Sequence, residues 1–120
     1  MRIAVSSEDN SGLDSTVSAH FGRCPFYILV DVEDGRVLET QAVANPYYDS
    51  HVPGAVPQFI REQGADVMIA GGMGARAVQL FQQFGVEAVT GAQGTVRQAL
   101  EGYLDGSLGG STPCVRHGQA

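Results

Sequence analysis

The sequence predicts a single α/β domain built on a five-stranded mixed sheet, with one antiparallel strand and three flanking helices. In the second half of the chain, short apolar runs alternate with runs of helical periodicity. A Gly-x-x-Gly turn joins strand to helix there twice, at 71–74 and 91–94. In the first half, three strand-like runs follow one another without a helix, so their directions alternate. A strand–helix–strand crossover returns the chain parallel, so only the second strand should run against the other four.

The first half of the chain supplies three of the predicted strands. The apolar run 2–6 is typical of a central strand, and the aromatic and β-branched run 26–32 is typical of a second one. Asp34 and Gly35 form a hairpin signal, so the run 36–44 should return beside it as the third strand.

The second half supplies three helices and two further strands. Each helix has an apolar stripe at helical spacing, and a capping-box pattern opens the last one. The two strands are continuous apolar runs, which are typical of strands buried on both faces. We expect helices over about 54–63, 74–85 and 95–105, and strands over 66–70 and 86–89. The side chains expected in the core are Ile3, Val5, Ile28, Val30, Phe59, Val67, Ile69, Leu80, Phe81 and Leu100.

Length and composition fit one domain, which we expect to span residues 1–106, followed by a flexible tail over 107–120. The 120 residues contain 7 Lys and Arg against 13 Asp and Glu, a formal net charge of −6. This excess of acidic residues argues against a nucleic-acid partner, because proteins that bind nucleic acids usually have a basic surface. With no signal peptide and no apolar run of membrane-spanning length, we expect a cytoplasmic protein without a membrane partner. We expect a monomer or weak dimer.

The most distinctive segment is His-Phe-Gly-Arg-Cys-Pro at 20–25, a predicted loop that places an imidazole and a thiol four residues apart. Imidazole and thiolate are ligands of soft metals and of iron–sulfur clusters. One such pair cannot complete a tetrahedral site. Taken alone, the pair also fits a buried cysteine beside a histidine that only makes hydrogen bonds.

Further soft ligands should reach the same edge of the predicted sheet. The loop with His20 and Cys24 follows the first strand, and the loop with His51 follows the third. Both strands end at the carboxyl edge, where open α/β sheets bind ligands. An extended tail is long enough to bring Cys114 and His117, a C-x-x-H pair, to that edge, although this pair also fits a solvated tail. These five residues are the candidate metal ligands.

The two Gly-x-x-Gly turns should face this edge as well, because each opens a helix. Unpaired N–H groups and the positive end of the helix dipole there favour an anion. The alternative is steric, since glycine permits a tight turn and close packing. Met73 and Arg76 add a soft side chain and a cation to the turn at 71–74.

Together these motifs resemble the dinitrogenase iron–molybdenum cofactor biosynthesis family, which includes NifX-like proteins and the C-terminal domain of NifB. The resemblance is carried by the segment 20–25 and by Ile-Ala-Gly-Gly-Met-Gly-Ala-Arg at 69–76. The segment 91–96, with the Tyr-Leu pair after it, adds a less specific match. The similarity extends over about residues 1–108, nearly the whole chain.

This resemblance implies a ribonuclease-H-like fold and the binding or carriage of an iron–sulfur precursor of the nitrogenase cofactor. The family's motif histidine carries over to His20, and the cysteine found in some members carries over to Cys24. Such a fold does not imply nuclease activity, because those nucleases need a group of carboxylates around two metals. Stand-alone relatives also occur in organisms without nitrogenase, so the resemblance leaves the kind of cluster open. The residues expected to bind the cofactor are Phe21, Gly22, Arg23, Gly71, Gly72, Met73 and Gly74.

Three functions compete. The leading hypothesis is a non-enzymatic carrier of an iron–sulfur cluster or iron–molybdenum cofactor precursor, absent from the protein when it is purified without cargo, with cofactor-assembly proteins as partners. Arg23, Arg76 and the helix N-termini would offset the cluster's negative charge. The second is a small enzyme acting on an anionic molecule at the same edge, which needs Cys24 and His20 in contact as nucleophile and base. The third is a regulatory protein whose tail recruits a partner.

Overall fold

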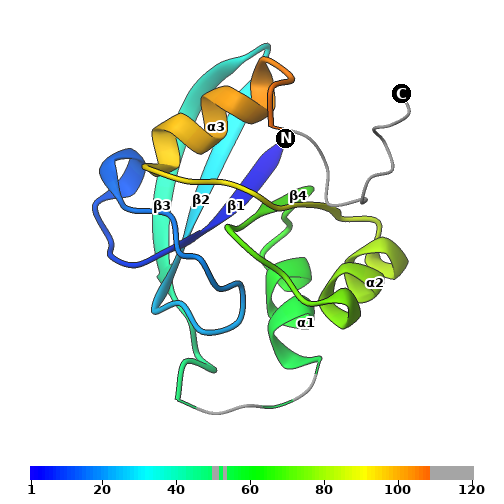
Figure 1. Cartoon of the computed structure of the whole chain (residues 1–120). Coiled ribbons are helices and arrows are strands. Elements are labelled where there is room, and N and C mark those ends of the chain that lie inside the picture. The colour runs from blue at the N-terminus through cyan, green and yellow to red at the C-terminus, as the bar shows by residue number, and fades with distance from the viewer. Residues whose placement is uncertain (50–51, 53, 109–120) are drawn as a thin grey trace.

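The computed structural model describes residues 1–49, 52 and 54–108, and it contains the α/β architecture that the sequence predicts (Figure 1). A five-stranded mixed sheet has the strand order β3-β2-β1-β4-β5. The strands are β1 (Arg2–Ser7), β2 (Phe26–Glu33), β3 (Arg36–Ala44), β4 (Val67–Ile69) and β5 (Glu87–Val89). The helices are a 3₁₀ turn, η1 (Gly12–Asp14), and α1 (Ala55–Glu62), α2 (Ala75–Phe84) and α3 (Val96–Leu104).

The strand directions confirm the predicted single antiparallel strand. β2 runs antiparallel to both β1 and β3, whereas β4 runs parallel to β1 and to β5. β1 is therefore central, and its residue Val5 pairs with Ile28 of β2 on one side and Ile69 of β4 on the other. The hairpin between β2 and β3 turns at Asp34 and Gly35, whose φ angles of 53° and 76° suit the tight turn expected there.

Helices cover both faces of the sheet, as Figure 1 shows. The helix α3 packs on one face through Val96, Ala99 and Leu100, against inward-pointing residues of β1, β2, β4 and β5. The helices α1 and α2 cover the other face, where Ile60 and Phe81 join the second core cluster. Because β1 alternates between these two clusters, every one of its residues from Ile3 onward is buried.

The predicted core is confirmed except at two positions. Phe59 and Leu80 are only half-buried, while the other eight expected core residues are at most 3% exposed. Phe59 packs at the margin of the second core cluster, and Leu80 lines a pocket beside α2. Helical spacing identifies an apolar stripe but does not distinguish its centre from its margin.

The edge strand β3 is the exposed part of the sheet. All of its residues from Arg36 to Ala42 are exposed, and Leu38 has 62% of its surface accessible. Val43 is the one residue of β3 that is half-buried, and it packs at the margin of the second core cluster. A register irregularity opposite β3, between Asp31 and Val32 of β2, interrupts the regular pairing.

The first two residues of the predicted tail are anchored. The backbone N–H of Leu108 donates to the carbonyl of Gly102 at 2.8 Å, and the Leu108 side chain packs against the core beside α3. The rest of the predicted tail, 109–120, lies outside the described residues. Within the part of the chain that the structure describes, no helix is long and apolar enough to cross a membrane.

Candidate functional site

The carboxyl ends of β1 and β4 bring two loops into direct contact. The backbone N–H of Gly71, just after β4, donates to the carbonyl of Ser18 at 3.0 Å, and the N–H of Ser18 donates to the carbonyl of Ser6 at 2.9 Å. A Cβ on Gly71 would lie 2.8 Å from the Cα of Ala19. At Gly71 the glycine is therefore required for steric reasons, because only a residue without a Cβ lets the two backbones approach this closely.

The contact between these loops forms a shallow pocket of about 360 Å³ at the carboxyl edge of the sheet. His20 lies in its lining with an exposed side chain, and its backbone N–H donates to the Ser18 hydroxyl at 3.2 Å. The structure thus brings His20 and the glycine turn together. The lining consists of Ala19, His20, Phe21, Gly22, Arg23, Gly72, Met73 and Gly74.

The N-terminus of α2 opens at this pocket. Gly74 is the N-cap residue and supplies no side-chain hydrogen bond to the first turn. The N–H groups at the start of the helix and its dipole therefore favour negative charge, by about 0.3–1 kcal/mol for an exposed anion. Arg76 follows in the first turn, and Met73 is half-buried beside it. This end of the pocket suits an anionic group.

Cys24 is not part of the pocket. Its side chain is 0% exposed and belongs to the core cluster beneath α1 and α2. Its Sγ lies 3.5 Å from the carbonyl oxygen of Phe21, and burial raises the pKa of the thiol. The loop thus presents His20 outward and turns Cys24 inward, so in this conformation the two side chains do not share an open site. Sequence spacing alone could not show this, because loop residues have no fixed side-chain period.

A buried hydrogen-bond network fixes the conformation of the 21–24 loop. The phenol of Tyr27 donates to the Phe21 carbonyl at 2.7 Å, and burial raises the pKa of this phenol. The Asn45 side-chain amide donates to the carbonyl of Cys24 at 2.9 Å and to that of Gly22 at 3.3 Å. Asn45 is a positioning residue that sequence reasoning missed, since a single Asn after a strand usually signals only a turn.

Cys24 should therefore react slowly with thiol reagents in the native protein. In a Cys114→Ser background, we expect its modification by a chromogenic aromatic disulfide to be on the order of a hundredfold slower than after denaturation. The reason is that the thiol is enclosed and its thiolate is disfavoured by burial. Absorbance of the released thiolate measures the rate. Equal rates in native and denatured protein would show that the loop opens freely.

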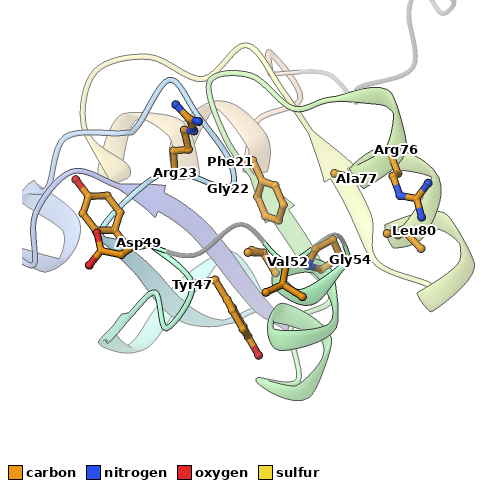
Figure 2. A pocket seen from close by; sticks show the side chains of 13 residues that line it. Phe21, Gly22, Arg23, Tyr47, Asp49, Val52, Gly54, Arg76, Ala77 and Leu80 are labelled. Carbon is orange, nitrogen blue, oxygen red and sulfur yellow. The ribbon is translucent and has the colours of Figure 1, made fainter.

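A second, larger pocket of about 720 Å³ lies beside the first and was not predicted from the sequence. In Figure 2, Phe21 lies near its centre, Ala77 and Leu80 of α2 line one side, and Tyr47 lies on the other. Val56 of α1 also lines it. The only sequence signal was that the loop after β3 carries adjacent tyrosines, which does not by itself indicate a pocket.

The other predicted ligands are not brought together by the described residues. His51, Cys114 and His117 lie outside that part of the chain. Among the residues that the structure describes, no three His, Cys, Asp or Glu side chains are grouped so that they could hold a metal ion. Cys24 and His20 also make no hydrogen bond to each other there. The nucleophile–base pair that an enzyme would need is therefore not formed in this conformation.

Comparison with protein families gives one match over most of the chain. The family model described as "Dinitrogenase iron-molybdenum cofactor" matches residues 1–106. This range contains both loops of the shallow pocket and all five strands.

Similar solved structures and a curated relative also cover most of the chain. The apo form of the orange protein from Desulfovibrio gigas has a TM-score of 0.81 at 32% identity, covering 92% of each chain. A Thermotoga protein provisionally assigned as NifB has a TM-score of 0.77 at 30% identity, covering 98% of each chain. An uncharacterised protein of Methanocaldococcus jannaschii is 24% identical over 110 residues, which is 90% of this chain and 89% of that protein.

Proposed function

Because the chain belongs to the dinitrogenase iron–molybdenum cofactor family, we propose that it is a non-enzymatic carrier of an iron–sulfur cluster or iron–molybdenum cofactor precursor. The family match supports a role connected with this cofactor. The observation that carries the finer proposal is the meeting of His20 with the glycine turn and the start of α2 in one pocket. The proposed partners are cofactor-assembly proteins that deliver or receive the cargo. The proposed location is the cytoplasm, where thiols stay reduced.

The donor set fits a cluster that brings most of its own ligands. His20 offers an exposed imidazole and Met73 a thioether, both of which are soft donors. The arginines Arg23 and Arg76 and the N–H groups of α2 offset negative charge rather than coordinate metal. With few protein ligands, a cluster built on its own sulfides can bind through one or two donors and later leave. That is the behaviour a carrier requires.

Cys24 is proposed as a second ligand that becomes available only when the 21–24 loop opens. Opening would break the Tyr27 and Asn45 hydrogen bonds and expose the buried thiol. Metal binding favours the thiolate, which partly offsets that cost. The proposal keeps His51, Cys114 and His117 as further ligands, on the support of their chemistry alone.

The proposed fold type is ribonuclease-H-like, on the support of the strand order with β1 at the centre and β2 antiparallel. A ribonuclease-H-like fold does not by itself imply nuclease activity. The pocket residues are an imidazole, a thioether, a guanidinium and glycines, without a carboxylate. A two-metal nuclease centre needs several carboxylates.

Anaerobic reconstitution with iron and sulfide tests the proposal. We expect wild-type protein to retain iron and sulfide after desalting, with charge-transfer absorbance in the visible range. The His20→Ala variant should lose most of it, because His20 is the exposed ligand in the pocket. Iron and sulfide per protein are the measured quantities, and near-ultraviolet circular dichroism checks that the variant is folded.

Three further variants, reconstituted in parallel, show which residues ligate the cluster. Cys24→Ser should reduce retention if the loop opens to bind the cluster, and Cys114→Ser reports on the tail. The control is Arg36→Gln on the exposed strand β3, which should retain wild-type iron. Wild-type iron retention in both His20→Ala and Cys24→Ser would mean that the site lies elsewhere.

A further inference from the structure

We propose that the larger pocket also binds a small organic anion with an apolar body, such as an aromatic or branched carboxylate, sulfonate or phosphate ester. This goes beyond the proposed carrier function, although Phe21, Gly22 and Arg23 line both pockets. The pocket volume of about 720 Å³ lies within the roughly 300–1,000 Å³ typical of small-molecule sites.

The inner wall of the pocket is apolar and well supported. Phe21 is 7% exposed, and its ring packs edge-on against Phe81 with the centroids 5.3 Å apart. Val56 is 8% exposed at the start of α1, and Leu80 of α2 lines the same pocket. These side chains come from the 20–25 loop and two helices that share the core cluster. The wall is therefore preformed and suits an apolar ring or branched chain.

The rim of the pocket carries an excess of positive charge. Among the described residues that line it, Arg23 and Arg76 come from two separate elements, and Asp49 is the single carboxylate. In Figure 2 the Arg23 guanidinium extends outward from the side of Phe21, and Arg76 lies on the opposite side with α2. Within the described residues, the ion pairs are Arg2–Asp31 and Arg97–Asp14, so neither rim arginine is paired there.

The positive rim and the apolar wall together determine which kind of ligand fits the pocket. The chain as a whole has a net charge of −6, so a positive rim is not a consequence of composition. An apolar molecule without charge would fill the wall but gain nothing from the two exposed guanidinium groups, which water solvates. A small inorganic anion would meet the arginines and leave the apolar wall in water. A molecule with an apolar body and one anionic group satisfies both parts.

The test uses the protein free of iron and two matched fluorescent probes. Anilinonaphthalene sulfonate carries an apolar body and one negative charge, and N-phenylnaphthylamine has the same rings without the charge. We expect the sulfonate to bind at one site per chain and about tenfold more tightly than the amine. NMR amide shifts should locate the probe at Phe21, Val56 and Ala77.

The arginine variants then test the rim. Arg23→Gln and Arg76→Gln should each weaken sulfonate binding by roughly two- to fivefold, as expected for exposed ion pairs, while Arg36→Gln on β3 should leave it unchanged. Unchanged affinity in the Arg23→Gln/Arg76→Gln double variant, equal binding of both probes, or shifts elsewhere would overturn the proposal. Because no iron is present, these outcomes are independent of cluster retention by wild-type protein and by His20→Ala.

Discussion

The Phe81→Ala variant is expected to lose about 3–5 kcal/mol of unfolding free energy, the largest effect of the changes considered. Phe81 is completely buried in the core cluster between α1, α2 and the sheet. Its ring also supports Phe21, whose centroid lies 5.3 Å away in an edge-on contact. Truncation to alanine reduces the apolar surface that is buried on folding. It also leaves a cavity that the surrounding strands cannot fill by small shifts.

Chemical denaturation followed by circular dichroism measures this loss. Leu38→Ala is the matched control, because Leu38 is 62% exposed on β3 and its truncation should cost less than about 0.5 kcal/mol. The Phe81 variant should also speed modification of Cys24, since Phe21 and Cys24 occupy the same cluster. A stability loss below about 1 kcal/mol would show that Phe81 is not packed as described.

The Gly71→Ala variant should lose about 1–3 kcal/mol, although it adds only one methyl group. That methyl carbon would lie 2.8 Å from the Ala19 Cα, 3.0 Å from the Ser18 carbonyl oxygen and 3.3 Å from the Ala92 carbonyl oxygen. All three atoms belong to backbone, so no side chain can rotate away. The two loops of the shallow pocket must then separate, and the hydrogen bond from Gly71 to Ser18 must lengthen.

Gly74→Ala is a stringent control from the same turn. No atom lies within 4 Å of a Cβ built there, and its φ of −69° suits any residue. It should cost less than about 1 kcal/mol, because the poorer N-cap preference of Ala is partly offset by the lower conformational entropy of its unfolded chain. Iron retention should fall in Gly71→Ala, because the two loops that form the shallow pocket must separate. Equal stability of the two variants would remove the steric explanation.

The sequence predicted the fold because its signals were local and mutually consistent. Asp34 and Gly35 determine the hairpin, and the Thr95–Gln98 capping box forms as expected, with both hydrogen bonds present. The crossover rule then determines the strand directions. Element ends shifted by at most one residue, and Phe59 and Leu80 proved marginal to the core. Those details depend on packing between elements, which local patterns do not contain.

The position of the candidate pocket could be predicted from the sequence, but the orientations of its side chains could not. Topology correctly placed the His20 loop beside the 71–74 turn, because both follow strands that end at the same edge. The orientation of Cys24 depends on the buried hydrogen bonds that Tyr27 and Asn45 make to the loop. Asn45 is distant from the loop in the sequence, and Tyr27 stands out in no motif. The larger pocket was missed for the same reason, since it forms between elements that share no motif.

The central position of β1 also has a consequence for the order in which the chain is synthesised. β1 leaves the ribosome before both strands that pair with it, and its partner β4 begins only at Val67. Once β2 and β3 have emerged, the nascent chain can form a three-stranded antiparallel sheet. The other side of β1, through Ile3 and Val5, then stays unpaired until β4 arrives. During that interval of translation the edge of β1 that carries Ile3, Ala4 and Val5 has no partner strand, so nascent chains stalled before β4 are the form most prone to aggregate.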